Sequence, residues 1–228
     1  MLEYQENFIK VAIENDVLKF GSFKLKSGRI SPFFLNAGNF NTGKALLNVG
    51  EFYSEAIVRS GLDFDVLFGP AYKGIPLAAA VSSTLSRVVP IELQKTKYNN
   101  AGFPFAFDRK EKKDHGEGGM IIGSSLQGKK VLIIDDVITA GTAIRNSVDL
   151  IQKNGGIVVG VIVAIDRQEI GADSDLSAVE EIKKEFGFNV YSIVQLDSVI
   201  EFLKTTESEH KQFLPQITDY RNKYGVKL

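Results

Sequence analysis

The chain has 228 residues, of which 44% are hydrophobic and 24% are charged, and its formal net charge is −1 at pH 7. These values are typical of a globular domain and exclude a disordered chain, and the near-zero charge provides no general attraction to nucleic acid or to an anionic membrane. The absence of cysteine excludes disulfides, thiolate metal sites and thiol nucleophiles. The first ten residues, MLEYQENFIK, lack the apolar core of a signal peptide, and no run approaches about 18 apolar residues, so we expect a cytoplasmic protein without membrane spans.

The first 40 residues predict a helix followed by a small hood. Apolar residues recur at helical spacing over residues 3–15, a pattern that favours an amphipathic helix packed on the core. Residues 17–40 are rich in aromatics, Gly, Ser, Pro and Asn, which indicates short strands joined by a turn at 27–29. Taken alone, the run Phe33–Leu35 would be assigned to the core.

A helix and a strand–turn–helix unit are expected next. The 3.6-residue pattern over residues 43–60 predicts a helix that stops at Gly61. A short buried strand at 66–68 then leads into the turn GPAYKG and a helix that starts at residue 75 or 76. The glycines of this turn permit close approach of a ligand to the backbone, and Lys73 adds a cation, although a lone loop lysine is more often simply solvated.

Charge concentrates in residues 94–119, where acids and bases alternate among glycines. The simplest interpretation is a solvated loop. Glycine hinges also suit a lid that closes its cations over an anionic substrate, and the two interpretations are compatible. We predict that residues 101–119 form a mobile catalytic loop, and we assign no function to the connector 94–104.

The segment VLIIDDVITAGTA, residues 131–143, carries the strongest chemical signal. Its apolar start, Val131–Ile134, predicts a strand buried on both faces of a parallel sheet, with Asp135 and Asp136 at its carboxyl end. The small residues 139–142 allow a loop of converging N–H groups before a helix over 143–154. This arrangement can bind a phosphate beside two acids that accept hydrogen bonds from sugar hydroxyls. The alternative is an ordinary strand–helix turn with capping residues.

The remaining chain continues the alternation of strands and helices. Residues 158–165 predict a strand that ends in DRQE, 176–186 a helix, 190–194 a last strand, and the tail from 197 one or two helices. As a lone observation, Arg167 would pair with Asp166 or Glu169. We therefore predict a single α/β domain over 1–228, with a central, mostly parallel sheet flanked by helices and a hood over 1–40.

The 131–143 segment resembles the phosphoribosyl-diphosphate (PRPP) motif of the type I phosphoribosyltransferases. KSGRISPFFL at 26–35, the turn FGPAYKG, RKEKKDHGEGG at 109–119 and DRQE at 166–169 resemble the orotate phosphoribosyltransferase branch of that family. Neither G-x-x-x-x-G-K-[ST] nor a strand-to-helix G-x-G-x-x-G occurs. The resemblance implies transfer of ribose 5-phosphate from PRPP to orotate with Mg²⁺, giving orotidine 5′-monophosphate and pyrophosphate in pyrimidine biosynthesis.

The resemblance also implies the site residues. The catalytic residues are Lys113, Asp135 and Asp136. The PRPP-binding residues are Lys26, Tyr72, Lys73, Arg109, Lys110, Lys113, His115, Asp135, Asp136, Val137, Ile138, Thr139, Ala140, Gly141, Thr142 and Ala143. The orotate-binding residues are Phe34, Leu35, Thr139 and Arg167.

Leu35 departs from the phenylalanine that is common in the family, so side-chain stacking there is in doubt while backbone contacts would survive. No protein ligand to the metal is implied, because Mg²⁺ is expected mainly on PRPP oxygens and water. The resemblance further implies a homodimer with shared active sites. Two alternatives stay open: a purine phosphoribosyltransferase, which should lack KSGRISPFF and DRQE, and a non-catalytic regulator that senses PRPP, which should carry a basic surface or an added module.

Overall fold

The computed structural model describes residues 1–25, 27–89, 102–113, 119–171 and 174–227. Within these residues the main sheet has six strands in the order β5-β4-β3-β6-β7-β8, and neighbours are parallel except for the antiparallel pair β4–β5. The strands are β3 (Val66–Gly69), β4 (Phe105–Lys113), β5 (Gly119–Gly123), β6 (Lys130–Val137), β7 (Ile157–Asp166) and β8 (Asn189–Gln195). The predicted α/β class with a mostly parallel sheet is confirmed.

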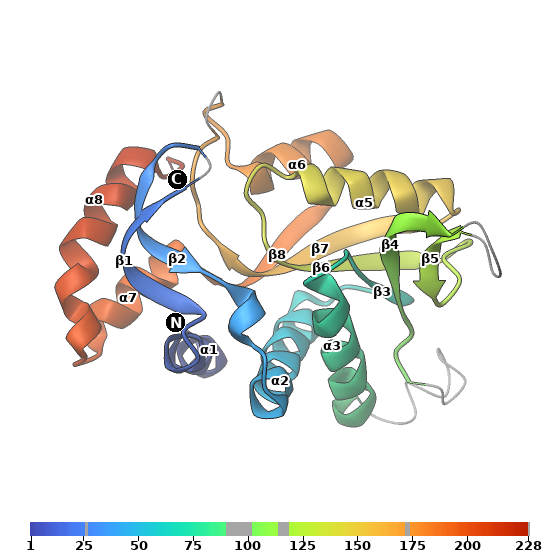
Figure 1. The fold of residues 1–228 in the computed structure, drawn as a ribbon, viewed down its shortest axis with the longest axis horizontal. Coiled ribbons are helices and arrows are strands. Elements are labelled where there is room, and N and C mark those ends of the chain that lie inside the picture. Colours follow the sequence, from blue (N-terminus) through green and yellow to red (C-terminus); the bar gives the residue numbers. More distant parts are fainter. Residues whose placement is uncertain (26, 90–101, 114–118, 172–173, 228) are drawn as a thin grey trace.

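Helices cover both faces of the main sheet (Figure 1). One face carries α2 (Gly43–Ser60) and α3 (Gly74–Val88), and the other carries α5 (Thr142–Lys153) and α6 (Ala178–Phe186). The central strand β6 shows the consequence, because Leu132 and Ile134 belong to one apolar cluster whereas Val131 and Ile133 belong to the other. Successive side chains of a strand point to opposite faces, so the continuous apolar run is explained by burial on both.

Local sequence signals set the helix ends. The side chain of Thr42 accepts a hydrogen bond from the N–H of Ala45 at the start of α2, and Gly61 ends that helix in the left-handed region at φ 66°. Helix α6 begins two residues later than predicted, because Ser177 and Glu180 form a capping box with the backbone. None of the helices in the described ranges is both long and apolar enough to cross a bilayer.

The predicted hood over residues 1–40 packs against the C-terminal helices, and both parts together are called the hood from here on. Its N-terminal part is α1 (Glu3–Glu14) and the antiparallel pair β1 (Leu18–Lys24) and β2 (Ile30–Leu35), followed by the short 3₁₀ helix η1 (Ala37–Asn39). The C-terminal part is α7 (Leu196–Thr205), the 3₁₀ helix η2 (Glu209–Phe213) and α8 (Leu214–Tyr224). The two parts lie side by side in Figure 1, and the ring of Phe33 on β2 meets that of Tyr220 on α8 edge to face at 6.1 Å. The sequence predicted the tail helices but did not place them here.

The predicted loop over 101–119 needs a correction. Residues 105–113 form a strand of the main sheet, because β4 pairs with β3 from Leu67↔Phe105 to Gly69↔Phe107 and then with β5. The segment is therefore an arm of a hairpin. Its intervening residues 114–118, which include His115, lie outside the described residues, as do Lys26 and most of the 94–104 connector. Movement of the hairpin stays a prediction.

Candidate active site

Three strand ends converge at one edge of the main sheet. Strands β3, β6 and β7 are parallel neighbours, with Phe68 opposite Ile133 and Val137 opposite Ile165. The turn after β3, the acid pair and loop after β6, and the DRQE segment after β7 therefore leave the sheet on the same side. The carboxyl edge of such a sheet is where open α/β folds bind their ligands.

The acid pair is buried and held by local hydrogen bonds. Asp135 is 9% exposed and Asp136 is 7% exposed. The N–H of Asp136 donates to Oδ1 of Asp135 at 2.9 Å, and the N–H of Val137 donates to Oδ1 of Asp136 at 2.8 Å. The second oxygen of Asp136, Oδ2, lies 3.0 Å from Nζ of Lys73. Lys73 is thus a partner of the acid pair rather than a solvated loop lysine, which fits its predicted place at the site.

The two acids differ electrostatically. Burial, followed by the neighbouring charge of Asp136, raises the pKa of Asp135 to about 7, against the lowering effect of its hydrogen bond from the Asp136 N–H and of Lys73. The hydroxyl of Tyr53 donates to the carbonyl oxygen of Asp135 at 2.8 Å, and burial raises the pKa of this tyrosine well above its usual value. Tyr53 therefore stays a donor that fixes the strand end. Asp135 therefore holds its proton to a higher pH than an exposed aspartate does.

The loop after β6 is the segment predicted to bind a phosphate. Gly141 takes the left-handed conformation at φ 72° and precedes α5, which no side chain of the described residues caps. The side chains of Thr139, Ala140, Thr142 and Ala143 are exposed around it. N–H groups at the start of an uncapped helix attract anions, so this loop suits a phosphate.

Arg145, which the sequence analysis did not single out, supports the loop after β6. Nη1 of Arg145 donates to the carbonyl oxygen of Ala140 at 2.8 Å, while its Nε and Nη2 pair with Glu185 at 2.7 Å and Glu181 at 3.5 Å. The signal was an arginine one turn into α5, but its acidic partners on α6 could not be assigned without the tertiary structure.

The turn after β3 is held closely to the sheet. A Cβ at Gly69 would lie 2.1 Å from the carbonyl oxygen of Gly74, so only glycine fits. The N–H of Ala71 donates to Oδ1 of Asp108 on β4 at 2.5 Å, and the peptide bond from Ala71 to Tyr72 is cis. The Tyr72 side chain points into solvent, at 72% exposed.

Cations from β4 stand beside this turn. Nζ of Lys110 lies 5.9 Å from the centre of the Tyr72 ring. The neighbouring Arg109 has a buried Nη1 that makes no hydrogen bond to the described residues. The backbone of Lys113 pairs with Gly119 at the far end of the hairpin. The structure thus brings Lys73, Arg109 and Lys110 to the strand-end region, as the sequence predicted.

The hood contributes the third side of the site. Arg167 follows β7, and its Nη2 lies 3.3 Å from Oγ of Ser31 on β2, while its guanidinium stacks 4.6 Å from the centre of the Phe33 ring. The predicted pairing of Arg167 with Glu169 is confirmed at 2.6 Å. Ser31 and Phe33 are contacts that the sequence analysis did not assign.

The two predicted hood residues have different environments. Phe34 is 40% exposed, and its ring stacks on Phe23 at 5.5 Å. Leu35 is 7% exposed and pairs with Leu18 across the hairpin, so its side chain belongs to the core. The side chain of Leu35 therefore offers no stacking surface to the site.

Comparisons with known proteins agree with this geometry. Residues 36–195 match the phosphoribosyl transferase domain. Orotate phosphoribosyltransferase of Marinobacter nauticus is 53% identical over 226 residues, and the match covers 99% of this chain and 100% of that protein. The Pseudomonas aeruginosa enzyme of the same name is 50% identical with the same coverage. A crystal structure of orotate phosphoribosyltransferase from Francisella tularensis superposes with a TM-score of 0.79 at 43% identity, covering 96% of this chain and 99% of that one. The chain therefore belongs to the phosphoribosyl transferase family and, within it, to the orotate phosphoribosyltransferases.

Proposed function

We propose that the carboxyl edge of the sheet and the hood together form the site at which this enzyme transfers ribose 5-phosphate from PRPP to orotate. The products are orotidine 5′-monophosphate and pyrophosphate, in the biosynthesis of pyrimidines. The observation that carries the assignment is that one edge joins a phosphate cradle, a lysine-paired acid and a hood-linked arginine. The joining contacts are Lys73 to Asp136 at 3.0 Å and Arg167 to Ser31 at 3.3 Å.

Different protein groups bind the phosphate, the ribose and the diphosphate of PRPP. Residues 137–143 hold the 5′-phosphate through backbone N–H groups, while Asp135 and Asp136 accept hydrogen bonds from the ribose hydroxyls. The diphosphate lies toward the turn after β3 and the start of the hairpin. Its cationic and hydrogen-bonding partners are Lys26, Tyr72, Lys73, Arg109, Lys110, Lys113 and His115. Among the described residues Nη1 of Arg109 is buried and has no acceptor, which supports this placement because a buried guanidinium nitrogen requires one.

Orotate occupies the hood side of the site. Arg167 binds its carboxylate, the exposed ring of Phe34 covers the heterocycle, and the backbone of Leu35 and the hydroxyl of Thr139 supply hydrogen bonds. The sugar carbon develops positive charge as pyrophosphate departs, so the chain's main task is to stabilise the leaving anion and to exclude water.

The metal belongs with the substrate in this proposal. The acid pair is poorly suited to coordinate Mg²⁺ directly. Asp136 is already paired with Lys73, and the pKa of Asp135 is raised to about 7, whereas a hard cation prefers ionised carboxylates. Mg²⁺ would be held mainly by PRPP oxygens and water. When bound, the metal neutralises charge on the diphosphate.

We also propose how the chain assembles and where it acts. Two chains form a homodimer in which the hairpin of one reaches the site of the other, and the phosphorylated substrate implies a cytoplasmic location. No nucleic-acid or membrane partner is proposed, since the net charge is −1.

The test is an assay with purified protein, PRPP and Mg²⁺, and either orotate or hypoxanthine as the base. Consumption of orotate alone is expected. Consumption of hypoxanthine would favour a purine enzyme, and PRPP binding without turnover would favour a regulator.

The variant Arg167→Lys should raise the KM for orotate with little change in the KM for PRPP, because an ammonium group cannot make the bidentate contact. Equal losses for both substrates would contradict the assignment of Arg167.

A further inference from the structure

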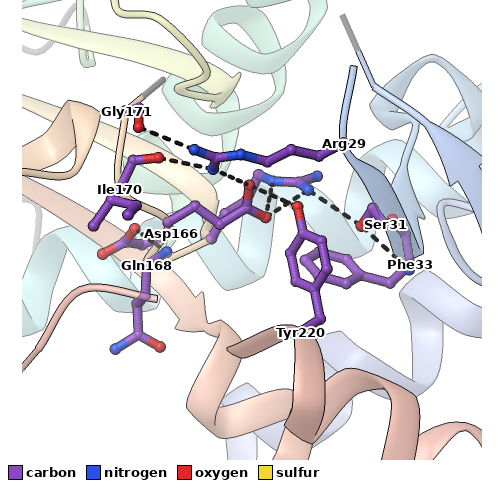
Figure 2. A network of polar contacts seen from close by, with 10 residues as sticks. Arg29, Ser31, Phe33, Asp166, Gln168, Ile170, Gly171 and Tyr220 are labelled. Carbon is purple, nitrogen blue, oxygen red and sulfur yellow. Dashed lines mark hydrogen bonds and ion pairs between the residues drawn. The ribbon is translucent and has the colours of Figure 1, made fainter. Parts of the chain in front are cut away.

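Glu169 lies between two arginines and a tyrosine beside the hood. Figure 2 shows Arg29 and Tyr220 of this cluster, with Ser31 and Phe33 of the hood. Its Oε1 accepts a hydrogen bond from Nε of Arg167 at 2.9 Å and lies 2.6 Å from Nη2 of the same guanidinium in an ion pair. Its Oε2 accepts from the hydroxyl of Tyr220 at 3.0 Å and lies 3.9 Å from Nη1 of Arg29. The Arg29, Arg167 and Glu169 side chains are 15%, 11% and 13% exposed, so these contacts are formed largely away from solvent.

These contacts engage the edge of the Arg167 guanidinium that carries Nε and Nη2. The edge that carries Nη1 makes none of these contacts with Glu169 and Ser31. Nε and Nη2 are directed to Glu169, Nη2 also reaches Ser31, and the plane rests on the Phe33 ring. Arg167 also interacts with the hydroxyl of Tyr220, which acts to lower the pKa of that tyrosine. No further hydrogen bond from Nη1 is present among the described residues. An arginine held at one edge and on one face has few rotamers left, so its remaining donors keep a fixed direction.

The local charge favours an anionic ligand. Two guanidinium groups face a single carboxylate, which leaves a net charge of +1 among Arg29, Arg167 and Glu169. Burial, with the charge of Glu169, raises the pKa of Tyr220 to about 12, so its hydroxyl remains a proton donor at neutral pH. Tyr220 therefore satisfies the second oxygen of Glu169 without adding charge.

The C-terminal helix places this tyrosine through a second set of contacts. Gln168, at φ 52°, separates Arg167 from Glu169, and its side chain forms a reciprocal pair with Asp197 at 3.0 and 2.9 Å. Arg221, next to Tyr220 on α8, donates to both oxygens of Asp197 at 2.9 and 3.2 Å. Helix α8 thus anchors the DRQE segment at Glu169 and, through Asp197, at Gln168.

We propose that Glu169 and Tyr220 are positioning residues for the base-binding pocket: they orient Arg167 so that its free edge meets the carboxylate of orotate. The inference rests on the proposed assignment of Arg167 to that carboxylate. It gives the C-terminal helix, which lies outside the matched domain at 36–195, a part in substrate selection.

The experiment compares Tyr220→Phe and Glu169→Gln with Tyr224→Phe, the matched control. Tyr224 is on the same helix, with its ring 4.9 Å from that of Tyr220, and its hydroxyl makes no hydrogen bond within the described ranges. Tyr220→Phe should raise the KM for orotate about tenfold, since a hydrogen bond to a charged group is worth roughly that factor. Glu169→Gln should raise it at least as much. The KM for PRPP and kcat at saturating orotate should stay within about twofold, and Tyr224→Phe should match the wild type.

The outcomes separate the two levels of the proposal. A wild-type enzyme that does not consume orotate would overturn the proposed function itself. The positioning role alone would be overturned by a different result. In that case the wild type is active and Arg167→Ala is not, but Tyr220→Phe and Glu169→Gln leave the KM for orotate unchanged. Equal changes in both KM values, accompanied by a lower melting temperature, would show that the cluster only supports the fold and would also overturn it.

Discussion

At the scale of single residues, the neighbouring acids Asp135 and Asp136 have different tasks because they have different partners. Asp136 keeps a cation beside it, whereas Asp135 is buried against the charge of its neighbour. Both are held by backbone N–H groups, so their positions do not depend on a bound ligand. If the acid pair only capped the turn, neither the Lys73 partner of Asp136 nor the raised pKa of Asp135 would be needed.

Asp136→Asn should reduce use of PRPP far more than it reduces stability. The amide keeps an acceptor for the N–H of Val137 but loses the charge that faces Lys73, which is half exposed and can be solvated instead. We expect kcat/KM for PRPP to fall roughly 10²-fold, and the melting temperature to change by less than about 4 °C. Steady-state kinetics and thermal unfolding test this. A collapsed melting temperature with normal activity per folded molecule would make the acid pair structural.

Asp135 should make stability depend on pH. An unfolded aspartate ionises near pH 4, whereas burial raises the folded pKa to about 7, so the folded state binds the extra proton in between. The stabilising contribution is therefore complete below about pH 4 and is lost as pH rises toward 7.

Asp135→Asn removes this titration, so the melting temperature of the wild type should fall relative to the variant from pH 4.5 to 7 and then run parallel to it. Curves that are parallel throughout would show that Asp135 is ionised in the folded enzyme.

At the scale of elements, the turn between β3 and α3 is limited by how closely its backbone passes itself. The Cβ that Gly69 lacks would meet backbone atoms of Gly74, which cannot move aside as a side chain could. The hydrogen bond from Ala71 to Asp108 ties the same turn to β4. The position of the cationic side chains around the turn therefore depends on a glycine that contacts no substrate.

Gly69→Ala should destabilise the enzyme by about 1–3 kcal/mol through overpacking, and it should also raise the KM for PRPP. The matched control is Gly43→Ala at the start of α2, where an added Cβ meets nothing within 4 Å. That variant should be neutral or slightly stabilising. Thermal unfolding and PRPP kinetics of both variants test the prediction, and equal behaviour of the two would rule out the close approach as the cause.

At the scale of the whole molecule, the two ends of the chain meet to form the hood over one end of the sheet, while the β4–β5 hairpin extends from the other side (Figure 1). Arg167 lies at the hood, whereas Lys113 is at the end of β4. The whole chain has a net charge of −1 and cannot attract a polyanionic leaving group by its total charge. Residues 109–113 contain four cationic side chains, and this local concentration can do so.

If each site combines Arg167 of one chain with Lys113 of the partner, two inactive variants should complement each other. Lys113→Ala should lose roughly 10²–10³-fold in turnover while still binding PRPP, and Arg167→Ala should fail in the orotate pocket. Mixing them should restore activity in heterodimers with one intact site, once native mass spectrometry has shown subunit exchange. Heterodimers without recovered activity would mean that the hairpin serves its own subunit.

The sequence by itself determined the elements and the chemistry at each strand end. The continuous apolar run at 131–134 predicted a strand buried on two faces, and the acids, small residues and glycine after it favoured a ligand loop over an ordinary capped turn. These properties depend on neighbours along the chain. The resemblance added the substrates. Local patterns also fixed the limits of α2 through Thr42 and Gly61.

Only the tertiary structure decided which strand ends and side chains meet. The pairing of Lys73 with Asp136 joins residues 63 positions apart, Arg145 finds its acids on another helix, and Tyr220 reaches Glu169 from the C-terminal helix. It also showed that the charged segment at 105–113 is a strand, since its pairing with β3 is a long-range contact that alternating charge and glycine composition do not encode. Such contacts depend on strand order and helix packing, and no local signal in a single sequence specifies either.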